Sequence, residues 1–133
     1  MKNLWDDKEA SQYQSDLDLR VYTSNLLGRS DELVLHGGGN TSVKNEEVMY
    51  VKASGFELGK IGEEGYVALD RMLLEKLKTR SYSENSDERE AQVKSDLLKS
   101  RLYPEQNRRP SVEASVHHAI RYKFVIHMHP THV

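Results

Sequence analysis

Phe124-Val125-Ile126-His127-Met128-His129-Pro130 is an apolar stretch that carries two histidines at positions i and i+2. Such a stretch predicts a strand, and side chains alternate between the two faces of a sheet, so His127 and His129 are expected to project to the same side. Two imidazoles at that spacing can share one metal ion. Two neutral rings can equally well pack and hydrogen-bond in a core, and the stretch by itself leaves both interpretations open.

The composition indicates one ordinary domain. The chain has 133 residues, and its hydrophobic fraction of 37% is high enough to build a core. A formal net charge of −2, with scattered basic residues, excludes a nucleic-acid footprint, and no apolar run is long enough to span a membrane. There is no cysteine, so any transition metal must be held by histidines and carboxylates. We expect a cytoplasmic protein.

Hydrophobic periodicity predicts short strands mixed with helices. The predicted helices cover residues 11–27, 71–77, 91–102 and the stretch after Ser111, and the predicted strands cover residues 33–35, 48–51, 66–69 and the histidine-bearing stretch. Gly28 is expected to end the first helix, and Asp70 and Ser111 to cap two later ones. Residues 79–90 lack periodicity and predict a mobile surface connection, and residues 104–110 predict a loop. The last helix is expected to bury four apolar side chains: Val112, Val116, Ala119 and Ile120.

This order of elements favours a sheet covered by helices over a doubly wound parallel fold. The sequence stops four residues after His129. Because a domain boundary rarely falls directly behind a central strand, we expect this chain to be the front portion of a longer protein.

The stretch His36-Gly37-Gly38-Gly39-Asn40 has three possible meanings. Glycines let the backbone approach a ligand, and Asn40 with the hydroxyls of Thr41 and Ser42 offers donors, which suits a phosphate. The same residues can form a plain loop. An oxyanion-hole loop of the esterase kind would need a Gly-x-Ser-x-Gly elbow, which this sequence does not contain.

Two further turns carry polar groups. Ser54-Gly55 exposes a hydroxyl and a backbone N–H, although it is also a common turn pair. Ser111 can cap a helix, bind an anion or do both. Glu113 falls in the first turn of that helix, and His117 lies one turn further on the same face, where the two can pair.

The order of these motifs resembles that of the class II aldolase/adducin N-terminal domain family. The resemblance is carried by Gly38-Gly39-Asn40-Thr41-Ser42, Lys52-Ala53-Ser54-Gly55, Pro110-Ser111-Val112-Glu113 with His117, and His127-Met128-His129. The sequence is most similar to the aldolase half of sugar-aldolase proteins fused to a short-chain dehydrogenase. The resemblance implies an α/β fold, namely an α/β/α sandwich around a mostly antiparallel sheet whose C-terminal part lies beyond this chain. It also implies a zinc ion and a cyclic tetramer.

The resemblance implies roles for individual residues as well. His127 and His129 would be zinc ligands, with a third histidine beyond residue 133, and Glu113 would be the catalytic acid/base. The substrate phosphate would be bound by Gly39, Asn40, Ser54, Gly55 and Ser111. Val112 stands where the family often has a second serine in the phosphate-binding turn.

The implied reaction is zinc-dependent retro-aldol cleavage of a ketose 1-phosphate, with a rhamnulose-like sugar as the first candidate. Two alternatives share the scaffold: an adducin-like binding domain without catalysis, and a sugar-phosphate epimerase or dehydratase. NAD is expected only if a dehydrogenase domain follows.

Overall fold

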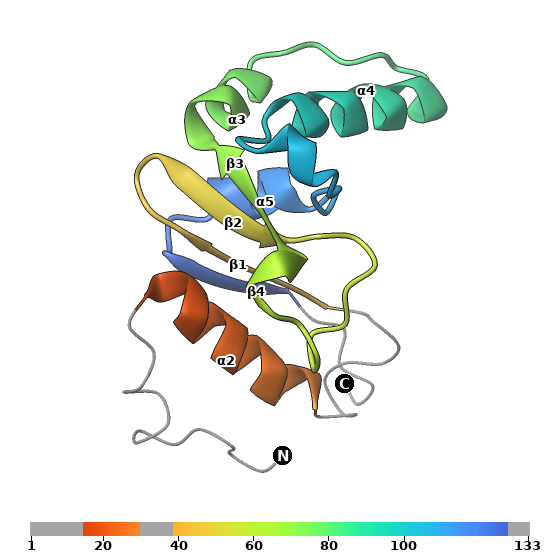
Figure 1. Ribbon diagram of the computed structural model, residues 1–133. Helices are drawn as coiled ribbons and strands as arrows, with labels where there is room; N and C mark the ends of the chain where they lie inside the picture. Colours follow the sequence, from red (N-terminus) through yellow and green to blue (C-terminus); the bar gives the residue numbers. More distant parts are fainter. Residues whose placement is uncertain (1–14, 30–38, 128–133) are drawn as a thin grey trace, which may run out of the picture.

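A four-stranded antiparallel sheet lies between helical layers in the computed structural model, which describes residues 15–29 and 39–127 (Figure 1). The strands are β1 (Asn40–Lys44), β2 (Val48–Lys52), β3 (Tyr66–Asp70) and β4 (Phe124–His127), and they lie in the order β3-β2-β1-β4. The helices are α2 (Asp16–Gly28), α3 (Arg71–Leu77), α4 (Ser86–Lys99) and α5 (Ala114–Ala119). Two short 3₁₀ turns cover Glu63–Gly65 and Pro104–Gln106. The expected α/β fold with an antiparallel sheet is therefore confirmed.

The two faces of the sheet carry different layers. Helix α2 covers one face, and α3, α4 and α5 lie on the other (Figure 1). Cross-strand partners project to the same face, and Ser42 pairs with Val51, which pairs in turn with Val67. These residues face α5, over the hydrophobic core made by Met49, Val51, Ala53, Val67, Leu69, Leu74, Leu97 and Ala114.

Strand β1 was not predicted, because its sequence Asn-Thr-Ser-Val-Lys looks like a continuation of the glycine turn. It is instead an interior strand whose five residues are all buried. Burial of polar side chains is tolerated when each finds a partner. Thr41 forms a trio with Ser24 and Tyr66, in which the hydroxyl oxygens lie 2.7–2.8 Å apart. The strand predicted at residues 33–35 falls outside the described residues.

Helix ends agree with the sequence at some positions and differ at others. Asp70 caps α3 as predicted, since its Oδ1 accepts from the Met72 N–H at 2.9 Å. Gly28 is the last residue of α2, and a side chain there would collide with the backbone of Gly59, 2.0 Å from the Cβ position. The mobile connection predicted at residues 79–90 is wrong in its last part, because α4 already begins at Ser86 with the Asn85 side chain as its cap.

The prediction for α5 was wrong in both its start and its buried face. The helix begins at Ala114 with Glu113 in the capping position, so Ser111 lies outside it. The helix buries Ala114, His117 and His118, whereas the four apolar residues Val112, Val116, Ala119 and Ile120 are exposed. Both histidines find hydrogen-bond partners on neighbouring elements: the His117 ring contacts Ser42 of β1, and the His118 ring contacts Glu75 of α3.

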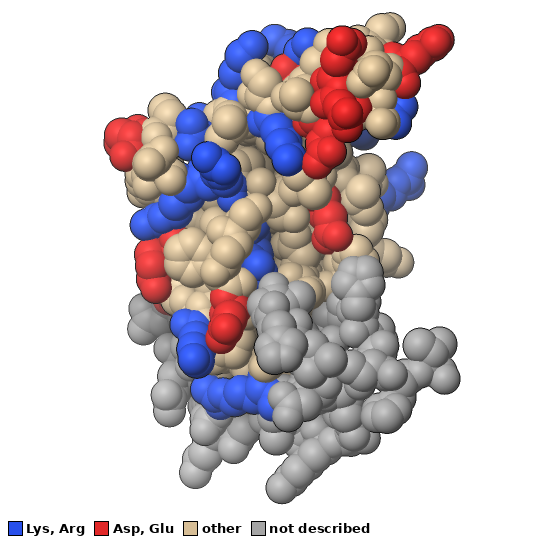
Figure 2. Space-filling model, turned by 90° about the vertical axis from the view of Figure 1, so that its right-hand side faces the viewer, with Lys and Arg blue, Asp and Glu red and all other residues tan. Residues whose placement is uncertain are grey.

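The surface mixes charges of both signs. On the face shown in Figure 2, Lys and Arg side chains lie among Asp and Glu, and acidic side chains gather over α4. Asp87 and Glu88 belong to the first turn of α4, where the helix dipole favours a negative charge. Within the described residues, no helix has both the length and the apolar character needed to cross a membrane.

Candidate functional site

Glu113 and His127 meet where α5 begins and β4 ends. Glu113 Oε2 lies 2.5 Å from His127 Nδ1, and the two side chains are 32% and 44% exposed. Both groups are therefore held together yet remain accessible to a ligand. A carboxylate on one ring nitrogen fixes the tautomer and orientation of an imidazole. His129 falls outside the described residues.

Strand β1 lies directly beside this pair. Asn40 is the cross-strand partner of His127, so the two side chains share a face of the sheet. Asn40 is 4% exposed, and its Oδ1 has no hydrogen-bond partner in the described part of the chain. Gly39 precedes it with φ of 83°, a left-handed conformation that favours glycine. The site thus contains a buried acceptor that has no partner among the described residues.

The Ser54 and Ser111 turns lie side by side. Ala53 and Pro110 form an isolated antiparallel bridge, flanked by hydrogen bonds from Ser54 N to Arg109 O and from Ser111 N to Lys52 O. Gly55 has φ of 92°, a left-handed conformation that favours glycine. Two turns that are far apart in the sequence, and that were both predicted to bind phosphate, are thereby brought side by side.

The Ser111 hydroxyl forms a hydrogen bond with Glu113, and Ser111 does not occupy the capping position of α5. Its Oγ accepts from the Glu113 backbone N–H at 3.2 Å. Glu113 O in turn accepts from His117 N at 3.1 Å. The backbone of Glu113 is therefore fixed on both sides, which orients its carboxylate toward β4.

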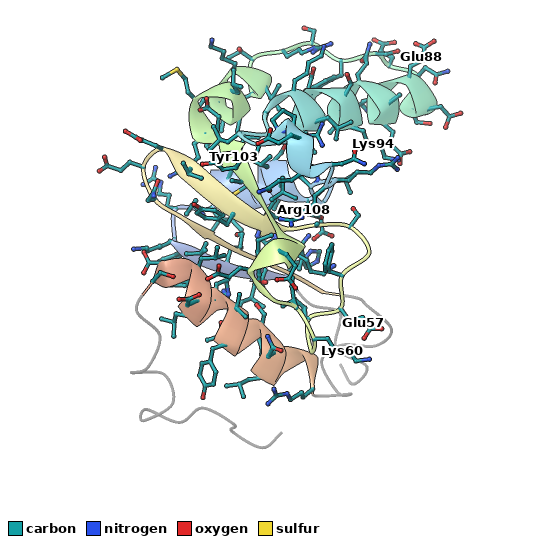
Figure 3. The ribbon with its side chains drawn as sticks, viewed as in Figure 1. Glu57, Lys60, Glu88, Lys94, Tyr103 and Arg108 are labelled. Carbon is teal, nitrogen blue, oxygen red and sulfur yellow. The ribbon has the colours of Figure 1, made fainter. Side chains whose placement is uncertain are left out.

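A groove of about 240 Å³ borders the Ser54 turn. It is lined by Ser54, Lys94, Leu97, Leu98, Arg109, Pro110 and Val112. Lys94 lies on the side of α4 toward the strands and Glu88 on the opposite side (Figure 3). Lys94 also pairs with Glu90 at 3.2 Å. The groove combines an apolar floor with two cationic side chains, and Val112 stands at its wall.

Lys52 is a buried lysine beside the Ser54 turn, to which the sequence reasoning gave no role. It ends β2 with 5% exposure, and its Nζ lies 3.4 Å from Ala53 O. The pKa of Lys52 is lowered, because the effect of burial exceeds the opposite effect of the negative charge of Glu113. The available signal was a lysine directly after the buried run of β2 and before the Ser54 turn.

His117 was predicted as a partner for Glu113, but its ring contacts β1 instead. His117 Nδ1 lies 2.6 Å from Ser42 Oγ, and the His117 carbonyl accepts from Lys44 Nζ at 2.8 Å. Burial lowers the pKa of His117 to about 4, and Glu113 raises it in opposition. The ring is therefore neutral near pH 7. Its Nε2 is buried and has no hydrogen-bond partner among the described residues.

Residues 19–133 match the family model of the "Class II Aldolase and Adducin N-terminal domain". The chain belongs to this family. The predicted family membership is thus confirmed.

Two relatives of this class II aldolase/adducin domain are longer than this chain. An uncharacterized oxidoreductase, YuxG, from Bacillus subtilis (strain 168) is 31% identical over 139 residues, covering 98% of this chain and 19% of that protein. The N-terminal class II aldolase domain of a conserved protein from Thermoplasma acidophilum is similar in structure, with a TM-score of 0.82 and 34% identity. That match covers 98% of this chain and 61% of the other. The domain therefore spans about a fifth of the curated relative and less than two thirds of the solved chain.

Class II aldolases generally depend on a metal ion. Within residues 15–29 and 39–127, however, no three His, Asp or Glu side chains are grouped so as to hold one. The Glu113–His127 pair supplies two side chains of suitable type, imidazole and carboxylate, and a carboxylate on Nδ1 is how proteins orient a metal-binding histidine. The described residues therefore fit part of a metal centre.

Proposed function

We propose that this domain catalyses metal-dependent retro-aldol cleavage of a ketose 1-phosphate, with a rhamnulose-like sugar as the first candidate. The observation that carries the proposal is the 2.5 Å contact between Glu113 Oε2 and His127 Nδ1 in a class II aldolase/adducin domain. An acid/base group beside a potential metal ligand is what cleavage of a carbon–carbon bond next to a carbonyl needs.

His127 and His129 would hold the metal, for which zinc is the first candidate because it accepts imidazole ligands readily. When bound, such an ion polarises the ketose carbonyl. Glu113 keeps His127 in one tautomer through the Nδ1 contact. This part of the proposal requires a third ligand from outside the described residues.

Glu113 would move the proton. Cleavage removes the proton of the hydroxyl on the carbon of the breaking bond that lies farther from the carbonyl, so that this carbon becomes an aldehyde, and a proton is later returned to the other carbon of that bond. A carboxylate that is 32% exposed and fixed through its backbone can reach both positions of a bound sugar. Orientation of the reacting carbons is expected to supply much of the rate enhancement.

The phosphate would bind at the paired turns of Ser54, Gly55 and Ser111, together with Gly39 and Asn40. The adjacent groove supports this assignment, since Lys94 and Arg109 add positive charge beside Ser54. Val112 lines the same groove, so a serine is replaced there by an apolar wall. We expect this substitution to weaken the hold on phosphate.

The proposal extends to the cellular location, the oligomeric state and a possible accompanying domain. The domain would work in the cytoplasm as part of a homotetramer. NAD enters only if a dehydrogenase domain accompanies the aldolase domain; the name of the Bacillus subtilis relative, an oxidoreductase, supports such a fusion.

Replacing Glu113 tests the proposal. In the full-length protein, Glu113→Gln should abolish release of dihydroxyacetone phosphate from a ketose 1-phosphate while leaving the metal content, measured by atomic emission, unchanged. Glu57→Gln is the matched control, because Glu57 is exposed and pairs only loosely with Lys60, at 3.7 Å. Both residues are glutamates, and Glu57 and Lys60 lie in a turn (Figure 3).

Other results would change the assignment. Undiminished turnover in the Glu113→Gln protein would refute its acid/base role. A purified full-length protein without metal or turnover would favour the adducin-like binding domain. Products that keep all carbons of the sugar together would favour an epimerase or dehydratase.

A further inference from the structure

The Ser42–His117 hydrogen bond joins the sheet to the helix that follows Glu113. Ser42 is fully buried on β1, and His117 is 1% exposed on α5. Their side chains meet at 2.6 Å although they lie 75 positions apart in the sequence. A second bond at the same point runs from Lys44 Nζ to the His117 carbonyl. Two residues of β1, Ser42 and Lys44, thus both bind His117 of α5.

His117, which these two bonds hold, lies one helical turn from Glu113. The His117 N–H donates to the Glu113 carbonyl, so a displacement of His117 is passed directly to Glu113. On the sheet side, β1 is hydrogen-bonded to β4, with Ser42 opposite Val125 and Asn40 opposite His127. Ser42 and His127 therefore belong to one rigid pair of strands, and Glu113 and His117 belong to one turn of helix.

Because the His117 ring is neutral, it can donate only one hydrogen bond. A neutral imidazole carries one N–H. If that proton is on Nδ1, it is donated to Ser42 Oγ, and Nε2, which has no partner in the described part of the chain, is only an unfilled acceptor. The other tautomer would bury an N–H donor without a partner, which proteins seldom tolerate. The Nδ1–H tautomer is therefore favoured, and the ring contributes through Nδ1.

We propose that His117, held by Ser42, is a positioning residue that sets the distance of α5 from the sheet and thereby the contact between Glu113 and His127. Other bonds also hold α5, from Lys44 Nζ to the His117 carbonyl and between His118 Nε2 and Glu75, but among the described residues the Ser42–His117 bond is the one that joins a side chain of α5 to a side chain of β1. The claim that the Glu113–His127 contact matters for catalysis rests on the proposed function, whereas the geometry of that contact does not.

The test follows the His127 ring proton by NMR in the full chain labelled with ¹⁵N in its six histidine rings. A short bond to a carboxylate moves an imidazole N–H resonance far downfield. In Ser42→Ala, we expect the His127 signal to lose this shift. Ser24→Ala is the matched control, because Ser24 is equally buried, also binds hydroxyls, and lies on the opposite face of the sheet. There the His127 signal should stay in place.

Two His117 variants keep the test decisive if Ser42→Ala does not fold. Asparagine places an amide near the Nδ1 position, so His117→Asn should retain the downfield signal. Glutamine extends its amide toward the Nε2 position, so His117→Gln should lose it. Equal behaviour of these two variants, or an unchanged signal in folded Ser42→Ala, would overturn the proposal.

Activity separates this inference from the proposed function. If both are correct, Ser42→Ala should reduce kcat on the order of 100-fold with little change in KM, as expected for a misplaced catalytic group. If the NMR shifts follow the prediction but no variant, nor the native protein, cleaves a ketose 1-phosphate, positioning stands and the proposed function fails.

Discussion

Acidification is predicted to destabilise the fold through His117. Burial lowers the pKa of this ring from 6.5 to about 4. As the pH falls below 6.5, the unfolded chain takes up a proton at this position, while the folded chain does not until about pH 4. The stability associated with neutral His117 is therefore fully present above pH 6.5 and is lost as the pH falls through this interval.

The size of the effect follows from the two pKa values. Each pH unit of the interval is worth about 1.4 kcal/mol, so the free energy of unfolding should fall by about 3 kcal/mol on its account. For a domain of ordinary stability, this is a large part of the total of about 5–15 kcal/mol.

The measurement compares native chain and His117→Asn in urea unfolding followed by circular dichroism, from about pH 7 down to about pH 4. Other titrating groups are common to both proteins, so the difference between the two unfolding free energies isolates His117. That difference should shrink by about 3 kcal/mol on acidification. In Ser24→Ala, which removes no titrating group, the difference from native should stay constant. A pH-independent difference for His117→Asn would refute the reasoning that the ring is buried and neutral.

Three further changes should alter the unfolding free energy at neutral pH, each measured by the same urea denaturation. Leu69→Ala should lower it by about 2–5 kcal/mol, because Leu69 is completely buried at the centre of the core. Asp70→Ala should cost about 1 kcal/mol by removing the acceptor for Met72 N–H, and Asp70→Asn should restore most of it. Lys60→Ala should change it by less than about 0.5 kcal/mol, since its ion pair with Glu57 is exposed; a larger loss would show an unrecognised contact.

Local signals in the sequence predicted much of the fold. Strands β2 and β3 were predicted from runs of Val, Met, Tyr and Leu, and α3 from its capping aspartate, because each of these signals acts within a few residues. The histidine-bearing stretch forms β4 up to the last described residue, His127. The start of α4 was missed because a charged, non-periodic segment gives no hydrophobic signal, although its Asn85 cap was visible.

The site was predicted less completely. The sequence indicated Glu113 and the serine turns as candidates, and the structure brings the turns together through the Ala53–Pro110 bridge. It gave no role to Lys52, and it offered His117 as a partner of Glu113 because helical spacing is the only contact that a sequence displays directly.

The sequence by itself determined the strands with apolar runs, the helix cap at Asp70 and the family to which the chain belongs, since these depend on residue type and spacing along the chain. Only the tertiary structure decided that β1 is an interior strand and that α5 turns its histidines inward. Polar residues can be buried only where partners exist, and the partners of Ser42 and Thr41 come from distant positions: His117, Ser24 and Tyr66. The contact between Glu113 and His127 depends on the same long-range packing, which spacing along the chain does not encode.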